Sequence, residues 1–368
     1  MKTYPIAKPL LGKKEEKYVL EVLRSGTLSI GSKVEAFEKR FAHYLGVKHA
    51  IAVSSGTAGL HLSLIGAGIK AGDEVITSPF SFVASANAVL FVGARPIFAD
   101  IDPVTYHIDP KKIAEKITPR TKAILVVHIF GQAAPMKEIL ALAQKHKLKV
   151  IEDACESIGA SYRGRKVGTF GESAVFAFYP NKQITTGEGG MIVTNNKTLA
   201  ALFRSLRNQG RSRDTRWLDH ECLGYNYRMD EMSAAVGLAQ LEQIHFLLKE
   251  RQKIAGWYSK FLSSHPNLVT VPHTPAHCVH TWFVYVVQSM TKKRERVIRA
   301  LATEGIMAKP YFPSIHLFSF YRNSFGLKEG DFPISESVSR RSLALPLYIG
   351  LTKKDIGYIC QRLIKTVS

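Results

Sequence analysis

An apolar run, a turn and an apolar helix follow one another in His49-Ala-Ile-Ala-Val-Ser-Ser-Gly-Thr-Ala-Gly-Leu60. The same order recurs along the first half of the chain, which predicts strands at 49–55, 73–79, 95–98, 123–127 and 149–152 and helices at 58–65, 82–91, 111–117 and 136–146. Strands separated by helices are typical of right-handed crossovers and a mostly parallel sheet. Residues 124–127 (ILVV) are apolar throughout, as expected of a strand buried on both faces. The sequence therefore predicts an α/β fold, with a mostly parallel central sheet flanked by helices.

The rest of the chain extends this fold and then departs from it. Two adjacent strands are predicted at 174–178 and 190–194, the second at the end of the sheet, and helices at 14–24, 33–45 and 229–264, the last bent near 244–246. Beyond about residue 250 the pattern predicts strands at 282–288 and 306–308, helices at 293–303 and 353–365, and a loop-rich region with several prolines. We expect a large α/β domain over 1–248 and a smaller α+β domain over 249–368.

Composition limits the classes of function. The net charge of +20 suits small anionic ligands or a solvated basic surface, and no zinc-finger spacing or aromatic-rich RNA-binding signature favours nucleic acid. The four cysteines lie far apart, which argues against a disulfide framework, and we predict no metal site. Without a signal-like N-terminus or a run of about 18 apolar residues, the chain is expected to be cytoplasmic and not to bind membranes.

Ligands of an open parallel sheet bind at the carboxyl ends of its strands, and three segments fall there. At Gly56-Thr57 a helix begins after a strand, so its N–H groups can bind an anion such as phosphate, although such a turn is also a common helix cap. Asp153 ends another strand and can hold a cationic ring nitrogen or cap the next turn.

The third segment is Phe178-Tyr-Pro-Asn-Lys-Gln-Ile-Thr-Thr-Gly-Glu-Gly-Gly190. Its lysine, Lys182, is either a solvated side chain or a nucleophile whose amine is activated by desolvation or by imine formation. A solvated lysine does not explain the small residues that follow it, which suggest backbone packed close to a ligand or a partner chain.

Taken together, these motifs resemble the sugar-nucleotide aminotransferases of the DegT/StrS type, which are pyridoxal-phosphate enzymes of fold type I. The resemblance covers nearly the whole chain, through S-G-T-A at 55–58, S-F-V-A-S-A-N-A at 81–88, F-A-D-I-D at 98–102, E-D-A-C-E-S-I-G-A at 152–160, the 178–190 segment, G-Y-N-Y-R-M-D-E at 224–231 and G-I-M-A-K-P-Y-F-P-S-I-H at 305–316.

The resemblance implies roles for individual residues. Lys182 matches the lysine that forms the Schiff base and moves the proton, Asp153 the partner of the pyridine nitrogen, and Phe82 the aromatic residue on the ring face. Gly56 and Thr57 match the phosphate-binding turn. Asn226 matches an asparagine contributed to the phosphate by a neighbouring subunit, which implies a homodimer with shared active sites; otherwise it is an asparagine in a turn.

Two positions depart from the family pattern. Ala177 stands where a serine often touches the cofactor phosphate, and Glu156 stands where glutamine or histidine is common near the cofactor's 3-hydroxyl. Glu156 is still expected to contact the cofactor, although a carboxylate there needs a proton or a cationic partner.

The substrate side is less defined by sequence. Lys309, Tyr311 and His316 are candidates for the sugar pocket, with a buried core histidine as the alternative for His316. Arg228 is a candidate contact for an anionic group, or a brace of the dimer.

We expect an aminotransferase that moves an amino group from L-glutamate to a nucleoside-diphosphate-linked 4-keto-6-deoxyhexose, as perosamine-synthase-like members do. A 3-keto acceptor is the alternative. Pyridoxamine-dependent sugar dehydration is disfavoured because those members replace the lysine with histidine.

Overall fold

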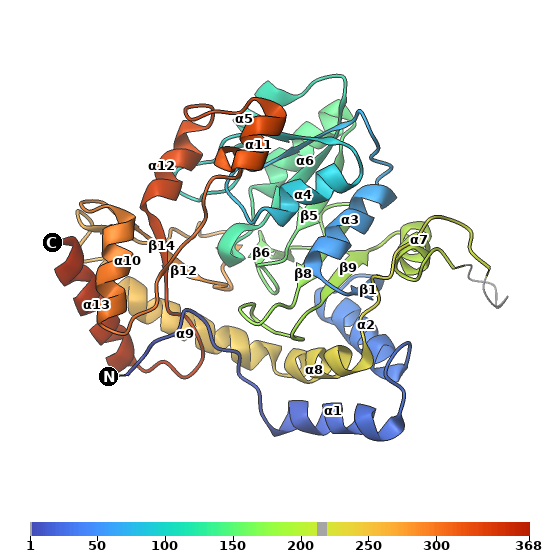
Figure 1. The fold of residues 1–368 in the computed structure, drawn as a ribbon, viewed down its shortest axis with the longest axis horizontal. Helices are drawn as coiled ribbons and strands as arrows, with labels where there is room; N and C mark the ends of the chain where they lie inside the picture. The colour runs from blue at the N-terminus through green and yellow to red at the C-terminus, as the bar shows by residue number, and fades with distance from the viewer. Residues whose placement is uncertain (1, 212–218) are drawn as a thin grey trace.

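A seven-stranded sheet forms the centre of the structure, a computed structural model that describes residues 2–211 and 219–368 (Figure 1). Its strands, in spatial order, are β1 (His49–Val53), β9 (Gly190–Thr194), β8 (Ser173–Ala177), β5 (Lys149–Asp153), β4 (Thr121–Val127), β2 (Glu74–Thr77) and β3 (Arg95–Phe98). Only β9 runs against its neighbours in this sheet, so the predicted mostly parallel α/β fold is confirmed.

One detail of the predicted topology was wrong, because β9 lies inside the sheet and β1 forms its edge. Strand β9 follows β8 without a helix between them, and a parallel neighbour would need a longer crossover. It therefore turns back beside β8 and leaves its other edge to β1.

Both faces of this sheet are buried, as the continuous apolar strands predicted. In β1, Ala50 and Ala52 point into one core, while Ile51 and Val53 point into the other. The first core is closed by α2 (Ser32–Leu45), α5 (Pro110–Lys116), α6 (Met136–His146) and α8 (Glu231–Glu242). The second is closed by α3 (Gly56–Gly66), α4 (Ala84–Phe91) and α7 (Lys197–Arg207).

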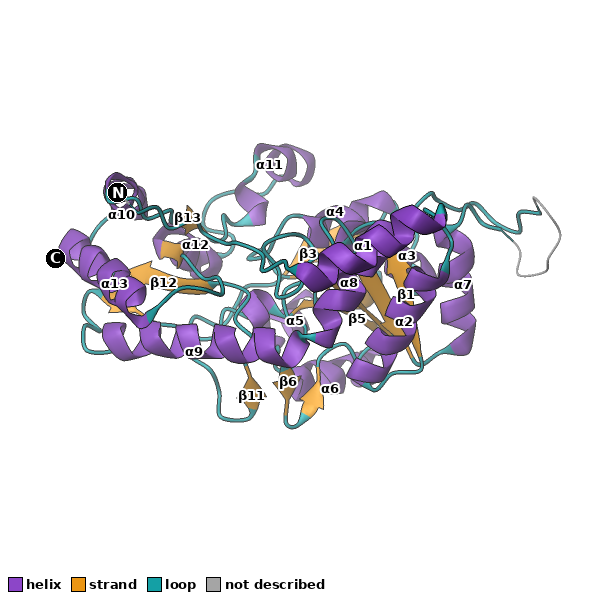
Figure 2. Cartoon of the chain, turned by 90° about the horizontal axis from the view of Figure 1, so that it is seen from below, coloured by secondary structure: helices purple, strands orange, loops and turns teal. Residues whose placement is uncertain are grey.

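A smaller antiparallel sheet lies beside the large one, in the order β10 (Val269–Thr270), β12 (Tyr285–Ser289), β14 (Ser342–Leu345) and β13 (Lys309–Pro310). It packs with α9 (Ile244–Leu262), α10 (Arg294–Thr303) and α13 (Lys353–Val367) around a core that also takes in Tyr4. Both termini therefore lie at this end of the molecule (Figure 2). The predicted strand at 306–308 is only a single bridge, from Ile306 to Tyr4. A domain boundary after residue 248 remains a prediction.

Helices also occur in the region that the prolines indicated to be rich in loops. Pro333 occupies the first turn of α12 (Pro333–Arg341), where a missing N–H costs no hydrogen bond, and α11 (Ser319–Phe325) precedes it. Tyr321 and Phe332 of this region pack on Phe98 of β3, which ties residues 315–341 to the large sheet. The other elements are α1 (Lys13–Ser25), β6 (Ser161–Tyr162), β7 (Arg165–Lys166), β11 (Cys278–Val279) and the short helices Ile129–Gly131 and Ile315–Leu317.

None of the helices in the described part of the chain is long and apolar enough to cross a membrane.

Candidate active site

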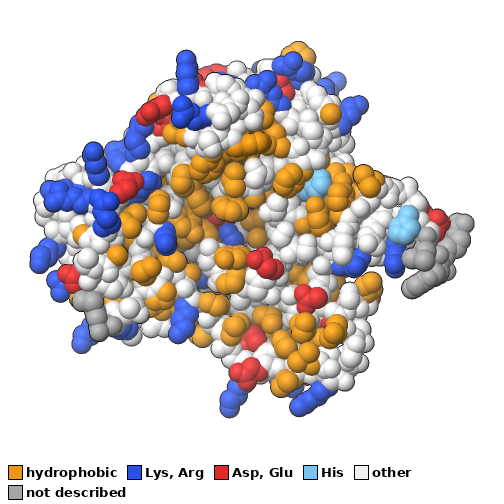
Figure 3. Space-filling view, in the orientation of Figure 1, with side chains coloured by type: hydrophobic (Ala, Val, Ile, Leu, Met, Phe, Trp, Pro, Cys, Tyr) orange, Lys and Arg blue, Asp and Glu red, His pale blue; other side chains and the backbone are white. Residues whose placement is uncertain are grey.

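A cavity of about 600 Å³ opens where the carboxyl ends of the large sheet's strands meet residues 309–318. Figure 3 shows hydrophobic side chains gathered around a hollow at the centre of this face. The lining includes Phe82, Phe283 and Phe312 as apolar walls, together with three carboxyl groups and two lysines. The candidate residues that line it are Gly56, Thr57, Phe82, Asp153, Glu156, Lys182, Lys309 and Tyr311.

Lys182 lies in the turn that follows β8, and its backbone N–H donates to the carbonyl of Tyr179 at 2.8 Å. Its side chain is only 13% exposed. The Nζ atom lies 3.9 Å from the centre of the Phe283 ring and 3.6 Å from Oε1 of Glu156. The amine is thus largely shielded from water, with one carboxyl group beside it.

Arg251 holds this turn in place, although no sequence motif marks it. Its buried guanidinium, reaching from the middle of α9, donates to the carbonyls of Lys182 at 3.0 Å and Trp282 at 3.1 Å. Burial lowers its pKa from 12.5 to about 10. A buried arginine with two such acceptors joins the lysine turn to the segment that carries Phe283. An arginine among the apolar positions of a long helix is the only signal that could have indicated it.

Asp153 ends β5 and lies on the floor of the cavity, almost fully buried. Its Oδ2 accepts a hydrogen bond of 2.7 Å from the Ser85 hydroxyl, and its Oδ1 accepts one of 3.2 Å from the N–H of Cys155. Ser85 was not among the candidate site residues from sequence, because only the fold brings α4 and the end of β5 together.

Gly56 begins α3, and the capping hydroxyl of Ser55 accepts from the N–H of Ala58 at 3.0 Å. A Cβ atom at position 56 would lie 2.8 Å from the Cβ of Ala177 and 2.9 Å from the Sγ of Cys155. Only glycine fits there without displacing a neighbour. Its absence of a side chain leaves the first turn of the helix open to the cavity, where N–H groups and the helix dipole favour an anion.

Glu156 is held by the backbone of Phe130, whose N–H donates to its Oε2 at 2.9 Å. Burial raises the pKa of this carboxyl group, and the Lys182 ammonium acts in the opposite direction. Burial also raises the pKa of Tyr311, whose hydroxyl accepts a 3.5 Å hydrogen bond from the side-chain amide of Asn181.

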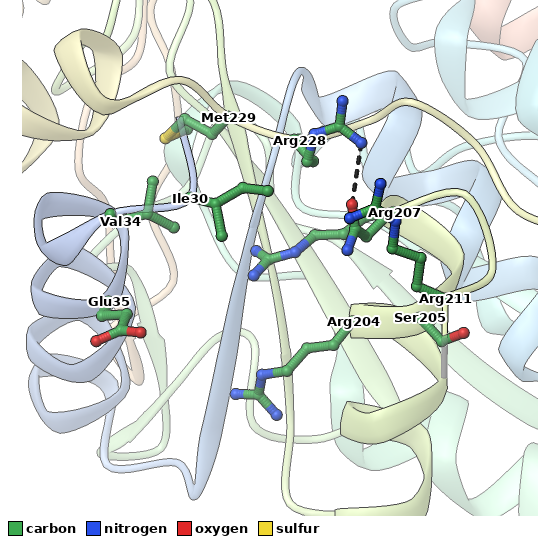
Figure 4. Close-up of a pocket in the computed structure, with 11 residues that line it drawn as sticks. Ile30, Val34, Glu35, Arg204, Ser205, Arg207, Arg211, Arg228 and Met229 are labelled. Carbon is green, nitrogen blue, oxygen red and sulfur yellow. Dashed lines mark hydrogen bonds between the residues drawn. The ribbon is translucent and has the colours of Figure 1, made fainter. Parts of the chain in front are cut away.

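Three candidate residues do not line this cavity. His316 is fully buried, 3.0 Å from Glu336, as in the core-histidine alternative, and the prediction that it lines the sugar pocket does not agree with this placement. Arg228 lines a second pocket, of about 250 Å³, between α2 and α7 (Figure 4). Its guanidinium donates to Oδ1 of Asn208 at 3.0 Å. Asn226 is exposed and pairs with Asn208 through a backbone bridge.

Comparison with known proteins identifies the family. A sequence model described as the DegT/DnrJ/EryC1/StrS aminotransferase family matches residues 9–364. A GDP-perosamine synthase of Caulobacter vibrioides is 44% identical over 358 residues, covering 96% of this chain and 95% of that one. The spore coat polysaccharide biosynthesis protein SpsC of Bacillus subtilis is 42% identical over 371 residues, covering 97% and 95%.

A solved structure agrees in fold along the whole chain. Helicobacter pylori PseC, an aminotransferase involved in the biosynthesis of pseudoaminic acid, superposes with a TM-score of 0.94 at 30% identity, covering 100% of this chain and 99% of that one. The chain therefore belongs to the DegT/DnrJ/EryC1/StrS aminotransferase family and is a pyridoxal-phosphate-dependent transaminase.

Proposed function

We propose that this enzyme moves an amino group from L-glutamate to a 4-keto-6-deoxyhexose carried by a nucleoside diphosphate. The observation that carries the proposal is the placement of one shielded lysine amine, that of Lys182, in the same cavity as the buried carboxylate of Asp153. The first turn of α3 borders one side of that cavity, and Phe82 borders another side.

The residues of the cavity fit pyridoxal phosphate. The α3 N-terminus offers N–H groups to a phosphate, and the close packing at Gly56 lets the ligand approach the backbone. Phe82, 58% exposed in this chain, offers a ring face. Each carboxylate oxygen of Asp153 accepts one hydrogen bond and keeps a lone pair free, which suits a protonated ring nitrogen.

When bound, pyridoxal phosphate supplies an electron sink for charge at the substrate α-carbon. Lys182 is then the group placed to take a proton from that carbon and return it, because its amine lies in the cavity and an unprotonated amine can act as a base. Oε1 of Glu156 lies 3.6 Å from this amine and places a carboxyl group beside it. Phe283 and the other apolar walls keep water from the amine.

The acceptor is inferred from three features together. Relatives named GDP-perosamine synthase match this chain at 44% and 39% identity. The apolar wall that includes Phe312 and Phe318 suits a sugar that carries a methyl group in place of a hydroxyl. Lys309 at the cavity and a net charge of +20 favour a diphosphate.

The test is a panel of 4-keto and 3-keto sugar nucleotides incubated with the purified protein, cofactor and glutamate, with amino sugar detected by mass spectrometry. Turnover of a 4-keto-6-deoxy sugar is expected, while turnover of 3-keto sugars alone would contradict the acceptor. Aspartate and glutamine in place of glutamate test the donor. The Lys182→Ala variant is the control, and it should lose the cofactor label that borohydride fixes on the wild-type protein.

The active sites are proposed to be shared within a homodimer. Asn226 is exposed and outside the Lys182 cavity of its own chain, which suits a contact with the cofactor phosphate of a second copy. Light scattering should give a mass twice that of the chain. Mixed and reassembled Lys182→Ala and Asn226→Ala subunits should recover about a quarter of wild-type activity, because half of the dimers are mixed and one of their two sites is intact. No recovery above the single variants would contradict sharing.

A further inference from the structure

Two buried serines near the start of α4 form a chain of hydrogen bonds that ends at Asp153. The Ser81 and Ser85 hydroxyl oxygens lie 3.0 Å apart, and the Ser85 hydroxyl lies 2.7 Å from Oδ2 of Asp153. Each of the three side chains is at most 6% exposed, and all three border the Lys182 cavity. Such a chain of polar groups is costly to bury unless each hydrogen bond is made.

The direction of the chain follows from the chemistry of its end. A carboxylate can only accept hydrogen bonds, so the Ser85 hydroxyl donates to Asp153. The Ser85 oxygen is then free to accept, and Ser81 donates to it. Donors in series polarise one another, so the Ser81 hydroxyl strengthens the bond from Ser85 to the carboxylate.

The same turn also carries Phe82. Ser81 and Ser85 stand four residues apart on either side of it, and the N–H of Ser85 donates to the Phe82 carbonyl at 3.3 Å. The aromatic side chain proposed to face the ring and the hydroxyl that holds Asp153 are therefore fixed by one short piece of backbone.

We infer that Ser85, supported by Ser81, is a positioning residue that aims the Asp153 carboxylate at the cofactor's pyridine nitrogen and keeps the shared proton on that nitrogen. The inference rests on the proposed contact between Asp153 and the ring. A hydrogen bond donated to a carboxylate stabilises its charged form, so it makes the carboxylate a weaker competitor for the proton. Without Ser85 the carboxylate gains rotational freedom and competes more strongly.

The test uses pyridoxal phosphate labelled with ¹⁵N at the ring nitrogen, bound to the full-length protein and observed by NMR. Asp153→Ala sets the resonance position of the unprotonated ring. Ser85→Ala should move the resonance part of the way from the wild-type position toward it, and Ser81→Ala should move it less. In a separate titration, Ser85→Ala should weaken cofactor affinity about tenfold, as expected for the loss of one hydrogen bond to a charged group.

Ser63 provides the matched control, since it is a fully buried serine on α3 that does not line the cavity. Ser63→Ala should leave the ring resonance and the cofactor affinity unchanged. In the Asp153→Ala background, Ser85→Ala should add less than about a twofold change, since the two residues act through one contact.

The outcomes separate the inference from the function on which it rests. If Asp153→Ala leaves the ring resonance in place, the proposed role of Asp153 fails. If Asp153→Ala moves the resonance and Ser85→Ala does not, the positioning role of Ser85 is overturned while the proposed function stands. An equal shift in Ser63→Ala would also overturn it, because the effect would then come from packing.

Discussion

Two buried histidines, His107 and His280, should make the protein lose stability as the pH falls below about 6.5. Burial lowers the pKa of His107 from 6.5 to about 4 and that of His280 from 6.5 to about 3. The hydrogen bonds agree with neutral rings, since Nδ1 of His280 accepts from the N–H of Trp282 at 3.0 Å and cannot do so once protonated. Besides burial, the neighbouring His107 further lowers the pKa of His280, and His128 further lowers that of His107.

The size of the effect follows from these values. Both folded-state pKa values lie below the unfolded value, so the unfolded chain binds more protons and stability falls as the pH falls. The loss begins below pH 6.5 and continues to about pH 4 for His107 and about pH 3 for His280. At pH 5, about 1.5 pH units below the unfolded value, each histidine costs about 2 kcal/mol, and the two together about 4 kcal/mol.

Denaturant unfolding of wild type, His107→Gln and His280→Gln at pH 8 and pH 5 measures this cost. Each glutamine variant should lose about 2 kcal/mol less than wild type between the two pH values, whatever its stability at pH 8. His265, a half-buried residue just beyond the end of α9, gives the control His265→Gln, which replaces a histidine outside the buried pair. An acid loss that is the same in wild type and in both buried-site variants would refute the assignment of neutral, proton-resisting rings.

Three further substitutions test the cavity. Gly56→Ala should weaken cofactor affinity at least about tenfold and cost about 1–3 kcal/mol of stability through overpacking. The control Gly256→Ala lies in open space on α9 and should stabilise the protein by about 0.5–1 kcal/mol. Equal effects of the two variants in calorimetry and cofactor titration would contradict the crowding at α3. Arg251→Met should cost about 3 kcal/mol and loosen cofactor binding, because the carbonyls of the lysine turn lose their donor; unchanged unfolding would argue against that brace. Glu156→Gln keeps an acceptor for the Phe130 N–H but carries no charge. The decrease in rate on the acid side of the pH–rate profile, above pH 4.5, should therefore disappear. A decrease that persists in this variant would show that another group causes it.

Local patterns were enough to predict most of the large sheet and its helices. The strand Arg95–Phe98 and the helix Met136–His146 have the predicted ends, because each follows a turn-forming residue, Gly93 or Pro135, and shows one period. The position of β9 could not be predicted in this way. Strand order depends on which edge a returning strand meets, and that is a property of the whole sheet.

The candidate site likewise contains residues that local sequence patterns indicate and residues that only the fold brings together. Gly56, Asp153 and Lys182 could be found because each stands at the end of a recognisable strand within a dense motif, and the structure places all three on one cavity. Arg251 and Ser85 could not be found in this way. Arg251 acts on Lys182, which is 69 positions away in the chain, and Ser85 acts on Asp153, which is 68 positions away. His316 shows the converse: it belongs to a matching motif, yet the fold buries it against Glu336.

The packing at Gly56 bears on the missing serine at position 177. The Cβ of Ala177 and the Sγ of Cys155 fill the space that a side chain at position 56 would need, so β8, the turn after β5 and the start of α3 meet at van der Waals contact. This contact fixes where the first turn of α3 lies and therefore where its N–H groups point. Thr57, next in the chain, brings a hydroxyl to the same cavity, while the Ser55 hydroxyl is engaged with the N–H of Ala58. Under the proposed function, we therefore expect binding of the cofactor phosphate to depend on the helix turn and Thr57 more than on the strand that leads to Lys182.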